Sequence, residues 1–134
     1  MTSILLDTNL LVYAWDSTNR IKQTKAIEIF EMNRQSISLS SQNLSELSAV
    51  LLKKHVDARE VAEIINAYVN LVPIIVLEPS DIVEAIRGVQ RYKMSLWDAQ
   101  IWAIARRSGG MTIFTEDGPI GQTIEGVAYV NPMS

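Results

Sequence analysis

The chain has 134 residues, of which 48% are hydrophobic and 20% are charged, so it is long enough for one globular domain with its own core. It contains no cysteine and one histidine, which excludes disulfides, thiolate metal sites, a cysteine nucleophile and any chemistry that needs two histidines. Its net charge of −3 gives no overall attraction to nucleic acid, so RNA binding would require local basic patches or bound cations.

No apolar run approaches the roughly 20 residues that a membrane helix needs. No basic segment precedes Ile4, as one would in a signal peptide. We therefore expect one cytoplasmic domain over residues 1–134 that does not enter a membrane.

The first predicted strand covers residues 3–7 and leads into a short helix over residues 9–15. The run Ile4-Leu5-Leu6 is typical of a strand buried on both faces, and Asp7-Thr8-Asn9 follows at its carboxyl end. Ligand sites of open α/β sheets lie just outside the carboxyl ends of the strands. Asp7 is therefore either a helix N-cap or the first member of a site.

The remaining elements alternate between helices and strands. Pro79 favours a helix start, and Gly109-Gly110 favours a helix end. Such alternation predicts an α/β domain with a parallel sheet covered on both faces. Helices are predicted over 20–34, 42–55, 58–70, 79–92 and 96–108, strands over 36–40, 73–77, 112–115 and 127–130, and residues 119–123 are compatible with a helical turn.

Four acids stand out by their position: Asp7, Glu46, Asp98 and Asp117. Two follow predicted strands and two lie near helix starts. Each also has a purely structural interpretation, because Asp7 can cap a helix and Asp117-Gly118 is favourable in a turn. Glu46 and Asp98 each end a four-residue segment with the spacing of a capping box.

Asp98 argues most strongly for a site, because residues 96–105 are apolar nearly all round and predict a buried helix. An ionised carboxylate in apolar surroundings costs several kcal/mol unless it is compensated. No lysine or arginine lies within three residues of any of the four acids. If the acids meet at one sheet edge, Mg²⁺ or Mn²⁺ is the natural compensation, and it supports phosphoryl-transfer or hydrolytic chemistry.

At these residues the chain resembles a PIN-domain ribonuclease, and most closely the VapC-like toxins of bacterial and archaeal toxin–antitoxin modules. The resembling segments occur in family order over essentially the whole chain. They are Leu-Leu-Asp7-Thr8-Asn9, Asn43-Leu-Ser-Glu46-Leu, Ser95-Leu-Trp-Asp98-Ala99, Thr115-Glu116-Asp117 and Val130-Asn131-Pro132.

The resemblance implies a three-layer α/β/α sandwich with a five-stranded parallel sheet. It also implies a toxin that hydrolyses RNA with Mg²⁺ or Mn²⁺ and leaves a 5′-phosphate and a 3′-hydroxyl. The acids at positions 7, 46, 98 and 117 would bind the metal, although Glu116 beside Asp117 leaves open which of the two faces it. Thr8, Asn9, Ser95 and Thr115 would orient these carboxylates. An antitoxin partner and a homodimer are further implications.

Arg87, Arg91 and Lys93 lie on or near one face of the helix over 79–92. With Arg106 and Arg107 they predict an RNA-backbone patch, unless they form a solvated face. Trp97 and Trp102 are interpreted as core residues. The helix over 58–70 is either part of the core alone or part of a dimer or antitoxin surface.

Two other functions remain as alternatives. A phosphatase or phospho-acceptor domain similar to the haloacid dehalogenases would use Asp7 as nucleophile, but that pattern needs a second aspartate where this chain has Asn9. A non-catalytic binding module with a PIN-like fold would not require all four acids.

Overall fold

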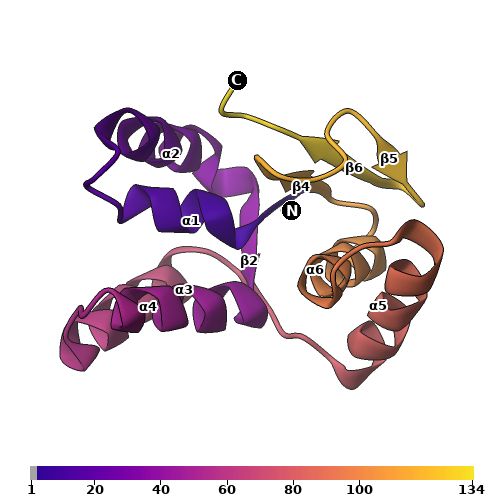
Figure 1. Cartoon of the computed structure of the whole chain (residues 1–134), viewed down its shortest axis with the longest axis horizontal. Helices are drawn as coiled ribbons and strands as arrows, with labels where there is room; N and C mark the ends of the chain where they lie inside the picture. Colours follow the sequence, from indigo (N-terminus) through magenta and orange to yellow (C-terminus); the bar gives the residue numbers. More distant parts are fainter. Residues whose placement is uncertain (1–2) are drawn as a thin grey trace.

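Six strands form one sheet at the centre of the molecule, seen in a computed structural model that describes residues 3–134 (Figure 1). The strand order is β3-β2-β1-β4-β6-β5, and every neighbouring pair is parallel except β5 and β6. The strands are β1 (Ile4–Leu6), β2 (Ile37–Ser40), β3 (Ile74–Ile75), β4 (Thr112–Phe114), β5 (Thr123–Ile124) and β6 (Val127–Val130).

Helices cover both faces of this sheet. They are α1 (Thr8–Ala14), α2 (Arg20–Asn33), α3 (Ser41–Lys53), α4 (Ala58–Leu71), α5 (Pro79–Tyr92) and α6 (Leu96–Arg107), with a short 3₁₀ turn, η1, over Arg34–Ser36. Helices α1 to α4 lie on one side of the sheet and α5 and α6 on the other (Figure 1). The predicted three-layer α/β/α architecture is confirmed. The predicted domain also includes Met1 and Thr2, which lie outside the described residues.

Two hydrophobic clusters, one on each face, hold the layers together. Successive strand residues point to opposite faces, so Leu5 packs with α5 and α6 while Leu6 packs with α1 to α4. Trp102 is fully buried in the first cluster, and its indole N–H donates to the Ile124 carbonyl at 3.1 Å. This alternation fixes which side of β1 faces which helical layer.

Local chemistry explains the helix starts. Ser40 caps α3 and forms a reciprocal capping box with Asn43, so the box lies three residues before the predicted Asn43–Glu46 pair. Pro79 is the first residue of α5, as predicted. Asp7 occupies the N-cap position of α1, as its structural interpretation requires. Within residues 3–134 its side chain makes no well-formed capping hydrogen bond, although the Asn9 backbone N–H acts to lower its pKa.

The C-terminal part of the sheet differs from the prediction of five strands. Residues 119–123 contain a turn and the start of β5, which pairs with β6 through a two-residue connection, Glu125-Gly126. Both residues have positive φ, 50° and 86°, as a tight hairpin turn requires. The predicted helical turn is therefore wrong, and the sheet has a sixth, antiparallel strand.

The predicted buried strand over 73–77 is shortened to β3, and Val76 beyond it is 58% exposed. No helix among residues 3–134 has the length and apolar character needed to cross a membrane.

Candidate active site

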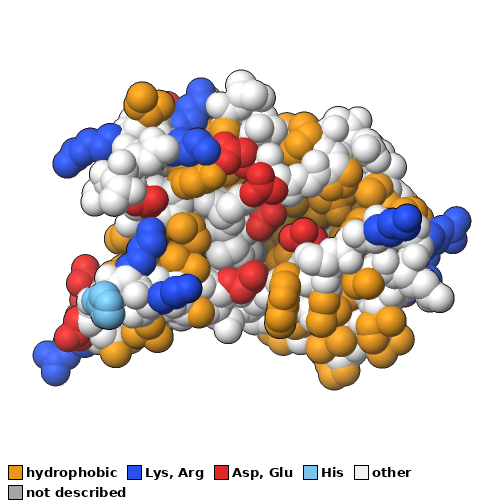
Figure 2. Space-filling model, in the orientation of Figure 1, with side chains coloured by type: hydrophobic (Ala, Val, Ile, Leu, Met, Phe, Trp, Pro, Cys, Tyr) orange, Lys and Arg blue, Asp and Glu red, His pale blue; other side chains and the backbone are white. Residues whose placement is uncertain are grey.

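Three of the four predicted acids line one cavity of about 400 Å³ at the carboxyl edge of the sheet. Asp7 directly follows β1, Asp117 lies in the loop after the neighbouring strand β4, and Asp98 lies in the first turn of α6. Figure 2 shows acidic side chains gathered in the middle of this face, between the helices on the two sides of the sheet. Parallel strands thus bring acids from distant parts of the sequence to one edge.

Glu46 comes from the opposite helical layer. It lies in the second turn of α3, and its Oε1 accepts a hydrogen bond of 2.9 Å from the Thr8 hydroxyl. Glu46 and Asp98 both act electrostatically on Asp7, so the four acids lie on one side of the molecule. In the observed side-chain conformations of residues 3–134, however, no three acidic or histidine residues form a group that could bind one metal ion. The four-ligand metal site therefore stays a prediction.

Thr115 organises the carboxylates that follow β1 and β4. Its hydroxyl donates to Asp7 Oδ2 at 2.9 Å, and its oxygen accepts from the Asp117 backbone N–H at 3.1 Å. Thr115 is 1% exposed. A buried hydroxyl in this position fixes the Asp7 carboxylate relative to the Asp117 loop.

Asn9 and Ser95 contact the site in different ways. Asn9 Nδ2 donates to Asp117 Oδ2 at 3.3 Å, while Asn9 Oδ1 is buried without a hydrogen-bond partner among residues 3–134. Ser95 lines the cavity, and its hydroxyl accepts from the Asp98 backbone N–H at 3.1 Å. Ser95 thus caps α6 and positions the Asp98 backbone, not the Asp98 carboxylate.

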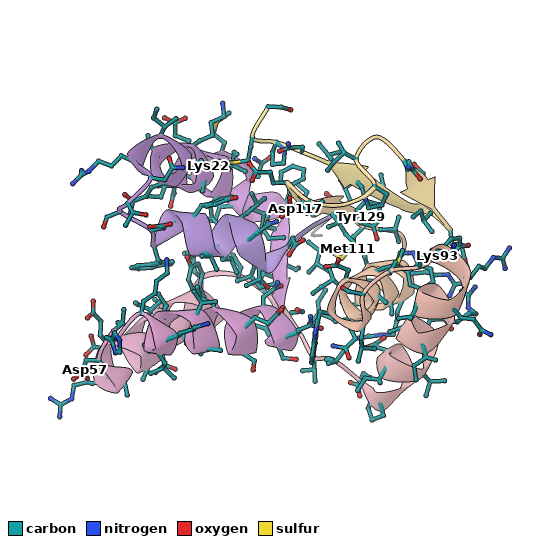
Figure 3. The ribbon with its side chains drawn as sticks, viewed as in Figure 1. Lys22, Asp57, Lys93, Met111, Asp117 and Tyr129 are labelled. Carbon is teal, nitrogen blue, oxygen red and sulfur yellow. The ribbon has the colours of Figure 1, made fainter. Side chains whose placement is uncertain are left out.

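Burial raises the pKa of Asp7, and the negative charges of Asp98 and Glu46 raise it further, while the hydrogen bond from Thr115 acts in the opposite direction. Tyr129 lines the same cavity, and burial followed by the charges of Asp98 and Asp7 raises the pKa of its phenol. Figure 3 shows Asp117 and Tyr129 near the centre of the molecule. The cavity is therefore a region of concentrated negative charge.

The burial predicted for Asp98 is wrong. Helix α6 is buried from Ala99 to Ala105, whereas its first turn carries an exposed Asp98 and a Trp97 that is 60% exposed. The interpretation of Trp97 as a core residue is therefore also wrong, whereas Trp102 is in the core. The argument from an uncompensated carboxylate applies to Asp7, which is half-buried.

The two adjacent acids after β4 have different surroundings. Glu116 Oε1 accepts hydrogen bonds from the Tyr13 hydroxyl at 2.5 Å and from Lys22 Nζ at 2.9 Å. These two contacts lower the pKa of Glu116. Asp117 lines the cavity and Glu116 does not. Lys22 comes from α2 (Figure 3).

The predicted arginine patch is engaged within the protein. Arg87 forms ion pairs with Glu84 and Glu125, and Arg106 contacts the same two acids. Hydrogen bonds from Arg87, then from Tyr92, lower the pKa of Glu125 to about 2. Arg91 lies over the ring of Tyr92. These guanidinium groups are less available to a phosphate backbone than solvated ones would be.

Two buried glutamines lie next to the site and were not predicted. Gln42 and Gln100 are 7% and 4% exposed, and Gln42 Nε2 donates to Glu46 Oε1 at 3.1 Å. Gln100 is the one uncharged polar residue within the apolar run of α6, from Leu96 to Ala105. A buried amide in such a run requires hydrogen-bond partners, and this signal was present in the sequence.

Comparison with known families identifies the fold. A sequence model described as PIN domain matches residues 4–122. The chain belongs to the PIN domain family. The predicted family resemblance is thereby confirmed, and no protein of curated function matches this PIN domain by sequence.

Solved structures support the same fold. VapC20 of Mycobacterium tuberculosis, described as a sarcin-ricin loop cleaving toxin, is 18% identical over 92% of this chain and 98% of its own, with a TM-score of 0.75. A toxin–antitoxin complex from Klebsiella pneumoniae is 23% identical over 97% and 98%, with a TM-score of 0.73. DNA-bound VapBC of Salmonella typhimurium is 16% identical over 96% and 97%, with a TM-score of 0.71. Because the sequence identities are low, the structural similarity to these proteins establishes the PIN fold alone.

Proposed function

We propose that this PIN domain is a divalent-cation-dependent endoribonuclease and the toxin of a toxin–antitoxin pair. One observation carries the proposal: Asp7, Asp98 and Asp117 line a single cavity at the carboxyl edge of the sheet, and Glu46 is held beside it. The structures to which the chain is similar include a toxin described as cleaving the sarcin-ricin loop and toxin–antitoxin complexes.

The residues of the cavity fit Mg²⁺ or Mn²⁺. Within residues 3–134 none of the four acids forms an ion pair, although Lys93 also lines the cavity, so their charge is at most partly balanced by protein cations. Asp7 is half-buried with a raised pKa, and the buried Asn9 Oδ1 lacks a partner, so the site offers unsatisfied oxygen atoms. Hard divalent cations prefer such oxygen ligands. Asp7, Glu46, Asp98 and Asp117 would hold the ion.

A bound Mg²⁺ or Mn²⁺ would supply water activation and neutralise charge on the phosphoryl group. The protein supplies orientation. Thr115 fixes one oxygen of Asp7, Thr8 fixes one oxygen of Glu46, and Asn9 contacts Asp117. Each contact limits the motion of a carboxylate that would otherwise be repelled by its neighbours.

The composition of the cavity favours attack by water over attack by the RNA 2′-hydroxyl. His55, the one histidine of the chain, does not line the cavity. The acid and base pair that cleavage through the 2′-hydroxyl requires is therefore not provided by histidine. We expect water to add to phosphorus and the 3′-oxygen to leave, giving a 5′-phosphate and a 3′-hydroxyl.

An apolar groove of about 570 Å³ supports the proposed antitoxin partner. It lies between α1, α2 and α4, and it is lined by Trp15, which is 43% exposed and donates its indole N–H to the Tyr68 hydroxyl at 2.9 Å. We propose that an apolar antitoxin segment binds there. The proposed homodimer would use the apolar surface of α5 and α6, where Val83, Ile86 and Trp97 are 71%, 57% and 60% exposed. Because the proposed substrate is RNA, we also propose that the protein acts in the cytoplasm.

The decisive experiment is cleavage of end-labelled RNA by the purified protein. We expect cutting with Mg²⁺ or Mn²⁺, products that carry a 5′-phosphate, and loss of cutting in excess EDTA or in the Asp7→Asn variant. Equal cutting in excess EDTA would refute the proposal. Formation of an aspartyl-phosphate on Asp7 without RNA cleavage would favour the phosphatase alternative instead.

A further inference from the structure

Two buried side chains connect the helices that carry Glu46 and Asp98. Gln42 lies in the first turn of α3, and Gln100 lies in the first half of α6. These helices pack on opposite faces of the sheet. Direct hydrogen bonds between them at the sheet edge therefore link the two helical layers beside the cavity.

The hydrogen bonds of the two amides have a defined donor and acceptor order. Gln100 Nε2 donates to Gln42 Oε1 at 2.6 Å, and Gln42 Nε2 donates both to Glu46 Oε1 and to the Trp97 carbonyl, each at 3.1 Å. If the Gln42 amide were reversed, its oxygen would face a carboxylate and a carbonyl, and its nitrogen would face that of Gln100. The two acceptors and the donation from Gln100 thus favour the same orientation, in which Gln42 donates to Glu46.

A second set of contacts reaches the same oxygen of Glu46. Asn43 Nδ2 donates to Thr8 Oγ1 at 3.0 Å, and Thr8 Oγ1 donates to Glu46 Oε1 at 2.9 Å. Both donors to Glu46 therefore contact Oε1. Within residues 3–134, Oε2 has no hydrogen-bond donor, so it is the oxygen left for a ligand.

We propose that Gln42 and Gln100 are positioning residues: they hold Glu46 by Oε1, leave Oε2 for the divalent cation, and fix α3 relative to the first turn of α6 that carries Asp98. This inference rests on the proposed function. Because neither glutamine lines the cavity, each acts through another residue and contacts neither substrate nor metal.

The test replaces each amide by methionine, which is similar in length but cannot donate to a carboxylate. We expect Gln42→Met to weaken Mn²⁺ binding, measured by calorimetry on the full chain, on the order of tenfold, and to lower kcat with little change in KM for RNA. Gln100→Met should act in the same direction with a smaller effect. The double variant should resemble Gln42→Met alone, since Gln100 acts through Gln42.

Gln90→Met is the matched control, because Gln90 is exposed on α5 and, within residues 3–134, makes no side-chain hydrogen bond. It should leave Mn²⁺ binding and kcat unchanged. Circular dichroism and denaturant midpoints confirm that each variant is folded at the assay temperature. If Gln42→Met does not fold, Gln100→Met alone decides, because it leaves the Gln42 amide in place.

The two proposals fail in different ways. If the wild-type chain neither binds Mn²⁺ nor cuts RNA, the proposed function fails, and the positioning role falls with it. If the wild type binds and cuts but both glutamine variants match Gln90→Met in Mn²⁺ affinity and kcat, only the positioning role is wrong. Independent, additive effects of the two substitutions would also contradict it.

Discussion

Replacing Asp7 by asparagine should stabilise the metal-free protein while it abolishes cleavage. Asp7 is half-buried, its pKa is raised first by burial, and Asp98 and Glu46 repel its charge. Asparagine removes the charge and can still accept the hydrogen bond that Thr115 donates to Asp7 Oδ2. Burial and repulsion of one partly buried charge typically cost on the order of 1 kcal/mol. We therefore expect a gain of that order in unfolding free energy, or about 3–5 °C in Tm.

The pH dependence of this gain has a defined sign. Because the folded pKa of Asp7 is raised above 3.8, the folded state holds this proton more tightly than the unfolded chain. The contribution of Asp7 to stability is complete below its unfolded pKa and is lost as the pH rises through the folded pKa. The advantage of the variant should therefore be absent well below pH 3.8 and complete above the raised value.

Calorimetric unfolding in EDTA, from pH 3 to pH 8, measures this difference. Asp57→Asn is the matched control, because Asp57 caps α4 far from the cavity and asparagine caps equally well (Figure 3). Added Mg²⁺ should raise the Tm of the wild type more than that of Asp7→Asn, since the ion binds the folded wild type more tightly. An Asp7→Asn variant that is less stable than the wild type at pH 7 in EDTA would refute the reasoning.

Three further predictions follow from contacts in the structure. Asp117→Asn should lower kcat by more than about a hundredfold, whereas Glu116→Gln should stay within about threefold, and equal losses in RNA cleavage would contradict the assignment of Asp117 to the cavity. Lys93→Met should raise KM for RNA severalfold and reduce the salt slope of binding by about 0.7, because Lys93 lines the cavity, while Arg91→Met should change neither. Gly88→Ala should destabilise the fold by about 1–3 kcal/mol in denaturant unfolding, since its Cβ would lie 2.9 Å from a buried indole ring, and an unchanged midpoint would show that the ring moves aside.

The sequence predicts most of the fold because its elements have strong local signals. Proline at the start of α5 and two glycines after α6 mark boundaries that agree with the structure to within a residue. The hairpin of β5 and β6 was missed because β5 has two residues and its turn, Glu125-Gly126, lacks the usual asparagine or aspartate. Edge strands this short are fixed by pairing with a neighbour, which periodicity does not report.

The site was predictable to a different degree at each residue. Residue type and position relative to strand ends were sufficient to nominate Asp7 and Asp117, which line the cavity. The exposure of Asp98 was not predictable, because hydrophobicity averaged along α6 hides the fact that its first turn is exposed. The contact between Gln42 and Gln100 joins residues 58 positions apart, so local sequence patterns do not predict it.

The position of the cavity explains why polar side chains had to be buried beside it. Asp98 lies on α6 and Glu46 on α3, and these two helices pack into two separate hydrophobic clusters. Apolar packing on either face of the sheet does not by itself fix the distance between them. The hydrogen bond between Gln42 and Gln100 helps to fix this distance, because it joins α3 directly to α6. The buried glutamine pair therefore sets the geometry of a site that neither core determines alone.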